Sequence, residues 1–184
     1  SQALSYDRLT NINYSIIGFT NLTEDHLDYH KTMENYLKAK LLILDHLKDN
    51  AKIIVNSDDE VHNSFKKDGH EFITFGFNGD YKINNFETDA AETKLNFSYD
   101  SKEYNVVIPL TSKFNVYNYL TMLSIVNQYG FEIDDIIKET ANLKAPKGRC
   151  ETYKVNGGFA IVDYAHTPDA VEKVITAYNE LKKG

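Results

Sequence analysis

Two histidines and three carboxylates lie close together near the start of the chain, in the stretch Glu24-Asp-His26-Leu-Asp-Tyr-His30. Imidazole and carboxylate groups bind metal ions and transfer protons. In open α/β sheets, polar groups that follow a strand commonly form the site. A histidine beside carboxylates is also typical of a surface loop or a helix cap. His26 alone therefore does not establish a site.

A lysine lies on the apolar side of the segment that follows. At about 100° per residue, Lys40 falls near the middle of an apolar stripe, whereas Lys38 points the other way. Such a lysine either extends its amine to water or is desolvated, and desolvation favours the neutral, reactive amine. A desolvated Lys40 and His26 can converge on one point. The stripe consists of Met33, Tyr36, Leu37, Leu41, Ile43, Leu44 and Leu47.

The elements that position these residues predict an α/β fold. An apolar run at 14–20 predicts a buried strand before the histidine loop, and 31–48 predicts a helix. The run at 51–56 predicts a second, parallel strand, and the carboxylates after it predict the first turn of another helix. Further on, the pattern predicts a strand at 71–77, an antiparallel meander at 81–86, 93–99 and 104–109, and helices at 112–126 and 134–142.

The segment Leu143-Lys-Ala-Pro-Lys-Gly148 is typical of a linker and predicts a domain boundary, which divides the chain into 1–146 and 147–184. A strand at 158–163 follows, and then a helix with Thr167 as its cap and Pro168 in its first position. About 36 residues after the linker are too few to bury a core by themselves. We expect this part to be poorly ordered or packed on its neighbour.

Composition excludes several classes of function. A net charge of −7 without clustered Lys and Arg argues against a nucleic-acid partner. No apolar run reaches the length of a membrane span, and no signal peptide opens the sequence. The single cysteine, Cys150, cannot form an internal disulfide, which fits a reducing compartment. We expect a cytoplasmic protein with no membrane partner.

The loop and helix residues resemble the Mur ligase family. The segments 20–30, 32–36 and Ala39-Lys40 are similar to the central domain of these enzymes, most of all in the MurE-type branch. The resemblance implies a partial central domain with a mostly parallel sheet flanked by helices and a small antiparallel meander, followed by the start of a Rossmann-like C-terminal domain. It also implies that Lys40 is carbamylated and binds Mg²⁺ together with His26, because a carbamate offers the oxygen ligands that Mg²⁺ prefers.

The same resemblance assigns the helix at 112–126 to the adenine of ATP. The family segment Phe-Asn-x-x-Asn matches Asn115 and Asn118, and the asparagine at the second position hydrogen-bonds the base. Arg8 matches an arginine that contacts the sugar-nucleotide substrate. From the pattern alone, Asn115 is equally a helix cap, and Asn118 and Arg8 are surface residues.

Three residues after the linker also match nucleotide contacts of the family. Arg149 lies in a Gly-Arg-x-Glu segment whose arginine reaches the ATP phosphates. Asp163 matches the aspartate that contacts the ribose, and His166 matches a histidine beside the nucleotide. Without the resemblance, Asp163 is equally a strand-end residue that caps the next helix.

The resemblance implies an ATP-dependent amide ligase of peptidoglycan precursor synthesis, and so of cell-wall growth, cell shape and cell division. The substrates would be UDP-N-acetylmuramoyl-L-alanyl-D-glutamate and a diamino acid, L-lysine or meso-diaminopimelate, with ATP and Mg²⁺ as cofactors and an acyl phosphate as intermediate. The sequence contains no phosphate-binding motif of the form G-x-x-x-x-G-K-[ST]. We therefore expect an internal fragment, inactive by itself, of a monomeric parent. Exposed sheet edges favour self-association of such a piece.

Two alternatives stay open at this point. One is another ligase of the superfamily, similar to folylpolyglutamate or cyanophycin synthetase, although the segments 27–30 and 163–170 favour the MurE type. The other is a non-catalytic binding module that has lost the phosphate-binding loop. The sequence does not distinguish lysine from diaminopimelate, because in this family the selecting motif lies outside the matching region.

Overall fold

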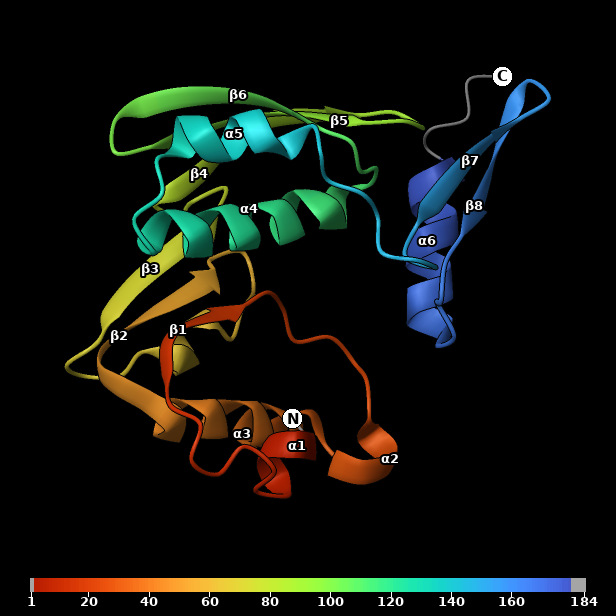
Figure 1. The fold of residues 1–184 in the computed structure, drawn as a ribbon. Helices are drawn as coiled ribbons and strands as arrows, with labels where there is room; N and C mark the ends of the chain where they lie inside the picture. The colour runs from red at the N-terminus through yellow and green to blue at the C-terminus, as the bar shows by residue number, and fades with distance from the viewer. Residues whose placement is uncertain (1, 180–184) are drawn as a thin grey trace.

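The computed structural model describes residues 2–179, which form a body (2–143) and a smaller C-terminal unit (147–179) (Figure 1). The predicted boundary between 146 and 147 falls between the two and stays a prediction. The elements of the body are α1 (Gln2–Ser5), β1 (Tyr14–Phe19), α2 (Leu27–His30), α3 (Met33–Leu41), the 3-10 helix η1 (Leu42–His46), β2 (Leu47–Asn56), the 3-10 helix η2 (His62–Phe65), β3 (Glu71–Gly76), β4 (Tyr81–Thr88), β5 (Thr93–Tyr99), β6 (Lys102–Ile108), α4 (Lys113–Gln128) and α5 (Ile133–Thr140).

One six-stranded sheet in the order β1-β2-β3-β4-β5-β6 forms the centre of the body. The strands from β1 to β4 pair in parallel, and β4, β5 and β6 pair antiparallel. The expected α/β fold with a parallel sheet and a meander is confirmed. The meander is not a separate sheet, however, because Phe75 and Gly76 of β3 pair with Tyr81 and Lys82 of β4.

Apolar side chains cover both faces of the parallel strands. In β2, Ile54 belongs to the core beneath α4 and α5, whereas Ile53 and Val55 belong to the core on the side of α3 (Figure 1). All three side chains are 0% exposed. Successive residues of a strand point to opposite faces, so a continuous apolar run is what a strand between two helical layers requires.

The helix predicted at 31–48 is correct only at its start. Thr32 caps α3 by accepting a hydrogen bond from the Asn35 backbone N–H at 3.1 Å. After Leu41 the chain tightens into η1, and Leu47 already pairs with Tyr14 of β1. Sheet pairing therefore ends the helix early, while the apolar residues 43, 44 and 47 still pack in the α3-side core.

The helix predicted to start with the carboxylates after β2 is also wrong. Residues 57–61 form turns, and only the short η2 follows. Asp58 accepts a hydrogen bond from the Phe77 backbone N–H at 2.9 Å, and Asp59 accepts one from the Leu22 N–H at 2.8 Å. These carboxylates therefore accept hydrogen bonds from segments that follow neighbouring strands. They do not begin a helix.

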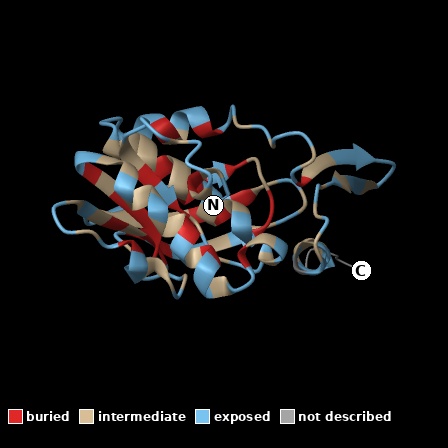
Figure 2. Cartoon of the chain, turned by 90° about the horizontal axis from the view of Figure 1, so that it is seen from below, coloured by how far each residue is buried: buried red, intermediate tan, exposed pale blue. Residues whose placement is uncertain are grey.

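The C-terminal unit consists of the hairpin β7 (Glu151–Val155) and β8 (Gly158–Val162) and the helix α6 (Pro168–Asn179). The predicted strand before residue 163 and the helix beginning at Pro168 are confirmed, whereas β7 was not expected. Figure 2 shows this unit mostly exposed beside the body. It contacts the body through α6, where the Tyr178 hydroxyl lies 2.7 Å from Thr111 Oγ1. Within residues 2–179, no helix combines the length and apolar character needed to cross a membrane.

Candidate functional site

The buried ring of Tyr36 brings His26 and Lys40 together. Lys40 Nζ lies 4.8 Å from the ring centroid, and the His26 ring meets the same ring edge-on at 6.3 Å. Tyr36 is 6% exposed, so the ring is a fixed part of the core. His26 and Lys40 therefore both contact one aromatic residue, while their convergence on a common ligand stays a prediction.

The two lysines of α3 have different surroundings. Lys38 is exposed and forms an ion pair with Glu34 at 2.7 Å, one helical turn away. Lys40 is partly buried and faces an aromatic ring. A cation above an aromatic face is attracted to it, and this attraction holds the Lys40 side chain toward the loop that contains His26.

His26 adopts a left-handed backbone conformation at the start of α2, with φ 54°. Its carbonyl accepts hydrogen bonds from the N–H groups of Tyr29 and His30, which begin the helix. Its ring nitrogen Nε2 lies 3.4 Å from Asp25 Oδ2. Left-handed geometry is uncommon for residues other than glycine, and such strain is often found at functional sites.

His30 is the buried histidine of this loop, at 6% exposure. Its ring stacks on Tyr36 with centroids 4.9 Å apart. Burial lowers the pKa of His30, and the positive charges of His26 and Lys40 lower it further. The neutral form is therefore favoured, and His30 acts as part of the packing around Tyr36.

Ring contacts extend from this cluster toward Arg8. The rings of Tyr29 and His30 lie 4.7 Å apart, those of Tyr6 and Tyr29 lie 5.4 Å apart, and the Arg8 guanidinium carbon lies 5.4 Å from the Tyr6 ring. Arg8 is exposed, and Tyr6 is 54% exposed. The aromatic residues that link Arg8 to the Tyr36 cluster follow no helical or strand period, which is why the sequence pattern did not reveal them.

The two asparagines of α4 bind each other and the preceding loop. Asn118 Nδ2 donates to Asn115 Oδ1 at 3.2 Å, and Asn115 Nδ2 donates to the Thr111 carbonyl at 2.7 Å. Asn118 is exposed beside a largely apolar groove of about 380 Å³. The other residues that line the groove are Thr20, Thr121, Met122, Ile125 and Val126.

In the C-terminal unit, the Tyr164 ring contacts two residues that were predicted to bind the nucleotide. The Arg149 guanidinium carbon lies 5.4 Å from the Tyr164 ring centroid, and the His166 ring lies 4.9 Å from it. The Tyr164 N–H donates to the Gly148 carbonyl at 2.7 Å, which joins the segment before β7 to the turn after β8. Arg149 and His166 are both exposed.

Asp163 lies at the centre of the same turn. Its Oδ2 accepts a hydrogen bond from the Cys150 N–H at 2.8 Å, and its Oδ1 accepts one from the Ala165 N–H at 2.7 Å. The carboxylate lies at the strand end as the pattern allowed, but it bonds the turn and does not cap α6, where Thr167 Oγ1 accepts the Ala170 N–H. Each carboxylate oxygen accepts more than one hydrogen bond, so these contacts leave capacity for a ligand.

The strand ends hold a third group of polar residues, of which the sequence pattern assigned only Asp58 to a helix start. Asn56, at the end of β2, is buried, and its Nδ2 donates to the Thr20 carbonyl at 2.8 Å. The Tyr117 hydroxyl of α4 donates to Asp58 Oδ2 at 2.9 Å. The position of these residues after a parallel strand was the available signal, since sites of open α/β sheets form there.

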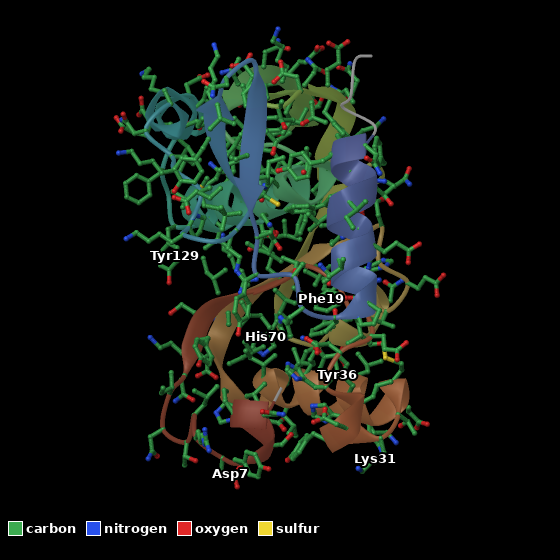
Figure 3. All side chains as sticks on the ribbon, turned by 90° about the vertical axis from the view of Figure 1, so that its right-hand side faces the viewer. Asp7, Phe19, Lys31, Tyr36, His70 and Tyr129 are labelled. Atoms are coloured by element: carbon green, nitrogen blue, oxygen red, sulfur yellow. The ribbon has the colours of Figure 1, made fainter. Side chains whose placement is uncertain are left out.

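Several segments that carry candidate residues face one side of the molecule. In Figure 1, the loop from β1 to α2 and the start of α4 face the side on which α6 and the hairpin stand. Figure 3 views this side directly, with Tyr36 in the part formed by α2 and α3 and Phe19 above it at the end of β1. In the part of the chain that the structure describes, no group of three or more His, Cys, Asp or Glu side chains is arranged to hold a metal ion.

Comparisons with curated proteins identify relatives along nearly the whole chain. The UDP-N-acetylmuramoyl-L-alanyl-D-glutamate--2,6-diaminopimelate ligase of Rickettsia rickettsii is 39% identical over 191 residues, which cover 99% of this chain and 39% of the relative. Ligase 1 of the same name from Clostridium acetobutylicum is 38% identical over 100% of this chain and 39% of its own length. The chain thus spans about two fifths of the length of these relatives.

Solved structures have the same fold. The structure of a UDP-N-acetylmuramoyl-L-alanyl-D-glutamate--2,6-diaminopimelate ligase superposes with a TM-score of 0.81 at 27% identity. The match covers 97% of this chain and 38% of the ligase chain. The MurF ligase from Thermotoga maritima in complex with ADP superposes with a TM-score of 0.80 at 21% identity, covering 95% and 40%, which is evidence for the fold alone. The family model for the Mur ligase middle domain matches residues 1–126, more than half of the sequence, and the chain therefore belongs to the Mur ligase family.

Proposed function

We propose that the chain supplies the central part of an ATP-dependent ligase that joins 2,6-diaminopimelate to UDP-N-acetylmuramoyl-L-alanyl-D-glutamate. The proposal rests on one observation: relatives of that name are similar to this chain across both the body and the C-terminal unit. Those names favour diaminopimelate over L-lysine. The substrate carboxylate would take the terminal phosphate of ATP, and the amine would then displace phosphate. Cytoplasmic location and a monomeric parent stay predictions.

The proposed nucleotide contacts come from α4 and from the C-terminal unit. The Asn118 amide offers a donor and an acceptor to the edge of adenine. Asp163 would accept hydrogen bonds from the ribose hydroxyls, and His166 would lie beside the nucleotide. The planar guanidinium of Arg149 suits two phosphate oxygens at once. The contacts of Arg149 and His166 with one tyrosine ring support a common role.

The proposed magnesium ligands are His26 and a carbamylated Lys40. An unmodified ammonium group repels a metal cation, so the residues fit Mg²⁺ only once Lys40 has reacted with carbon dioxide. The carbamate then adds anionic oxygens to the His26 nitrogen, and hard oxygen donors are what Mg²⁺ prefers. Bound there, the metal would neutralise charge on the phosphates. Tyr36 would keep both ligands oriented, and Arg8 would bind the anionic sugar nucleotide.

The carbamate is tested by ¹³C NMR of the chain in ¹³C-bicarbonate with Mg²⁺. We expect a carbamate signal in the wild type and in Lys38→Arg that is lost in Lys40→Arg, since a guanidinium does not react in this way. The α-amino group also forms a carbamate, so the difference between the two lysine variants decides. Equal spectra for Lys38→Arg and Lys40→Arg would contradict the assignment.

The ligase function is tested in a chimera, because the chain alone is expected to show no ligase activity. The matching segment of the Clostridium acetobutylicum relative is replaced by this chain, and ATP-dependent amide formation is measured with diaminopimelate and with L-lysine. We expect activity with diaminopimelate, and a loss of at least about 100-fold in the Lys40→Ala chimera, because a lost metal ligand removes several kcal/mol of charge stabilisation. A folded chimera, verified by its cooperative unfolding, that forms no amide would refute the proposal.

A further inference from the structure

The end of β2 ties together the ends of its two neighbouring strands. Asn56 donates from Nδ2 to the Thr20 carbonyl at the end of β1, at 2.8 Å, and its Oδ1 accepts the Asp58 N–H at 3.0 Å. The Asp58 carboxylate accepts the Phe77 N–H just beyond β3, at 2.9 Å. Thr20 is also the first residue of the loop that leads to His26.

The same carboxylate binds α4. The Tyr117 hydroxyl donates to Asp58 Oδ2 at 2.9 Å. Gly76 makes room for this carboxylate, because a Cβ added at residue 76 would lie 2.7 Å from Asp58 Oδ2, and its φ of +135° also favours glycine. Burial, together with the Asp58 charge, raises the pKa of Tyr117, so its hydroxyl remains a donor at neutral pH.

These bonds connect two residues that line the groove beside Asn118. Thr20 and Asn118 both line it, the first from the strand end and the second from α4. The contacts run from Thr20 through Asn56 and Asp58 to Tyr117, the residue that precedes Asn118 in the helix. Side-chain hydrogen bonds therefore connect the end of β1, on one side of the groove, to the start of α4 on the other.

A second contact joins α4 to β1 by direct packing. At Gly18 of β1, an added Cβ would lie 3.0 Å from Ile125 Cδ1 and 3.1 Å from Thr121 Cγ2. The helix thus rests on β1 at its third and fourth turns by side-chain packing. At its end, Gln128 also donates hydrogen bonds to the hydroxyls of Tyr81 in β4 and Tyr99 in β5. The first two turns, which contain Asn115 and Asn118, also pack on the core, and the Tyr117 hydroxyl bonds them to Asp58 just beyond β2.

We propose that Asp58 and Tyr117 form a positioning pair that fixes the first turns of α4 against the ends of β2 and β3 and thereby sets the direction of the Asn118 amide. The effect on nucleotide binding rests on the proposed function of Asn118. The effect on the helix itself does not depend on that function.

The helix provides its own matched control. Tyr119 is 2% exposed, and its hydroxyl lies 2.8 Å from Thr140 Oγ1 of α5. Tyr119→Phe removes a hydroxyl from the same helix, two residues away, but on the side facing α5. A general weakening of the helix would follow from either change, whereas a positioning role predicts that only Tyr117→Phe affects the first turns and the nucleotide.

The experiment measures two properties of the full chain: amide hydrogen exchange at residues 115–118, and ADP binding by calorimetry. We expect Tyr117→Phe and Asp58→Ala to raise exchange at these amides about five- to tenfold relative to the rest of α4, the size of one lost hydrogen bond, and to weaken ADP binding by a similar factor. The double variant should show less than the sum of the two effects, because both residues act through one bond. Tyr119→Phe should change neither property selectively.

Each other outcome has a definite meaning. Unchanged exchange in Tyr117→Phe, or an equal selective effect of Tyr119→Phe, overturns the positioning pair. Faster exchange with unaltered ADP affinity overturns its role toward Asn118. If the wild-type chain binds no ADP, the proposed nucleotide site fails, while the exchange data still decide whether the pair fixes the helix.

Discussion

Strands β5 and β8 both contain apolar residues but have different surroundings. In β5, Leu95 and Phe97 are 2% and 0% exposed, because α4 and α5 cover that face of the sheet. In β8, Phe159 and Val162 are 46% and 49% exposed. Figure 2 shows the same contrast between the body and the C-terminal unit as a whole. An apolar sequence is thus sufficient for a strand, but burial requires a second layer of structure.

The C-terminal unit therefore depends on a few specific contacts. Among its residues with described burial, Cys150 alone is buried. Its contacts with the body include the hydrogen bond between the hydroxyls of Tyr178 and Thr111. Because the hydrophobic effect scales with the apolar area removed from water, we infer that the free energy of unfolding is concentrated in the body.

The largest expected effect is on the free energy of unfolding, when the same Phe→Ala substitution is made in the body and in the C-terminal unit. Phe97→Ala leaves a cavity in the core of the body and should lower the free energy of unfolding by about 3–5 kcal/mol. Phe159→Ala, on the half-exposed hairpin, should change it by less than about 1 kcal/mol. Urea denaturation followed by circular dichroism measures both. Equal losses would mean that the C-terminal unit unfolds together with the body and shares its core.

The contrast between local pattern and tertiary structure also explains what the sequence could predict. The alternation of Leu95, Phe97 and Tyr99 predicted β5, and the stripe containing Leu120 and Leu123 predicted α4, because each repeats with the period of its element. The helix at 31–48 was overextended, since the same apolar residues pack equally well from a 3-10 turn and a strand. Pairing of Leu47 with β1 decides between them, and a local pattern does not contain that pairing.

The sequence proposed the residues of the candidate site but not the contacts that support them. His26 and Lys40 were found from residue type, helical phase and family resemblance. The ring of Tyr36 that joins them appeared only as one member of an apolar stripe. The bond between Asp58 and Tyr117 joins residues 59 positions apart in the sequence, and no single-sequence pattern relates them. Such long-range contacts are properties of the fold.

The next effect is on the alkylation rate of Cys150, the buried thiol of the C-terminal unit. Burial raises the pKa of Cys150 from 9.0 to about 11; the Tyr178 hydroxyl lowers this pKa in part, and the nearby Asp163 carboxylate raises it. Alkylation by iodoacetamide at pH 8 should therefore be roughly 100-fold slower in the folded chain than in urea, since the thiolate is the reactive form. The rate should rise about tenfold per pH unit toward pH 11.

The same shift links the thiol to stability. A group whose folded pKa is raised stabilises the fold fully below its unfolded pKa, here 9.0, and this contribution is lost as the pH rises toward about 11. Mass spectrometry of the alkylated chain gives the rates. Fast alkylation at pH 8 in a chain whose body remains folded would show that the C-terminal unit opens independently, which would sharpen the distinction between the two regions.

The smallest expected effect is that of Tyr178→Phe, which removes the hydroxyl bonded to Thr111 and leaves the ring. A typical hydrogen bond contributes about 1 kcal/mol, so exchange of the α6 amides should rise roughly fivefold while the urea midpoint of the body stays constant. Tyr153→Phe is the control, because its hydroxyl bonds Glu151 within the same hairpin and should leave α6 unchanged. If Tyr178→Phe instead lowers the stability of the body, then the C-terminal unit supports the start of α4. In that case the first turns of α4 depend on docking of α6 as well as on Asp58.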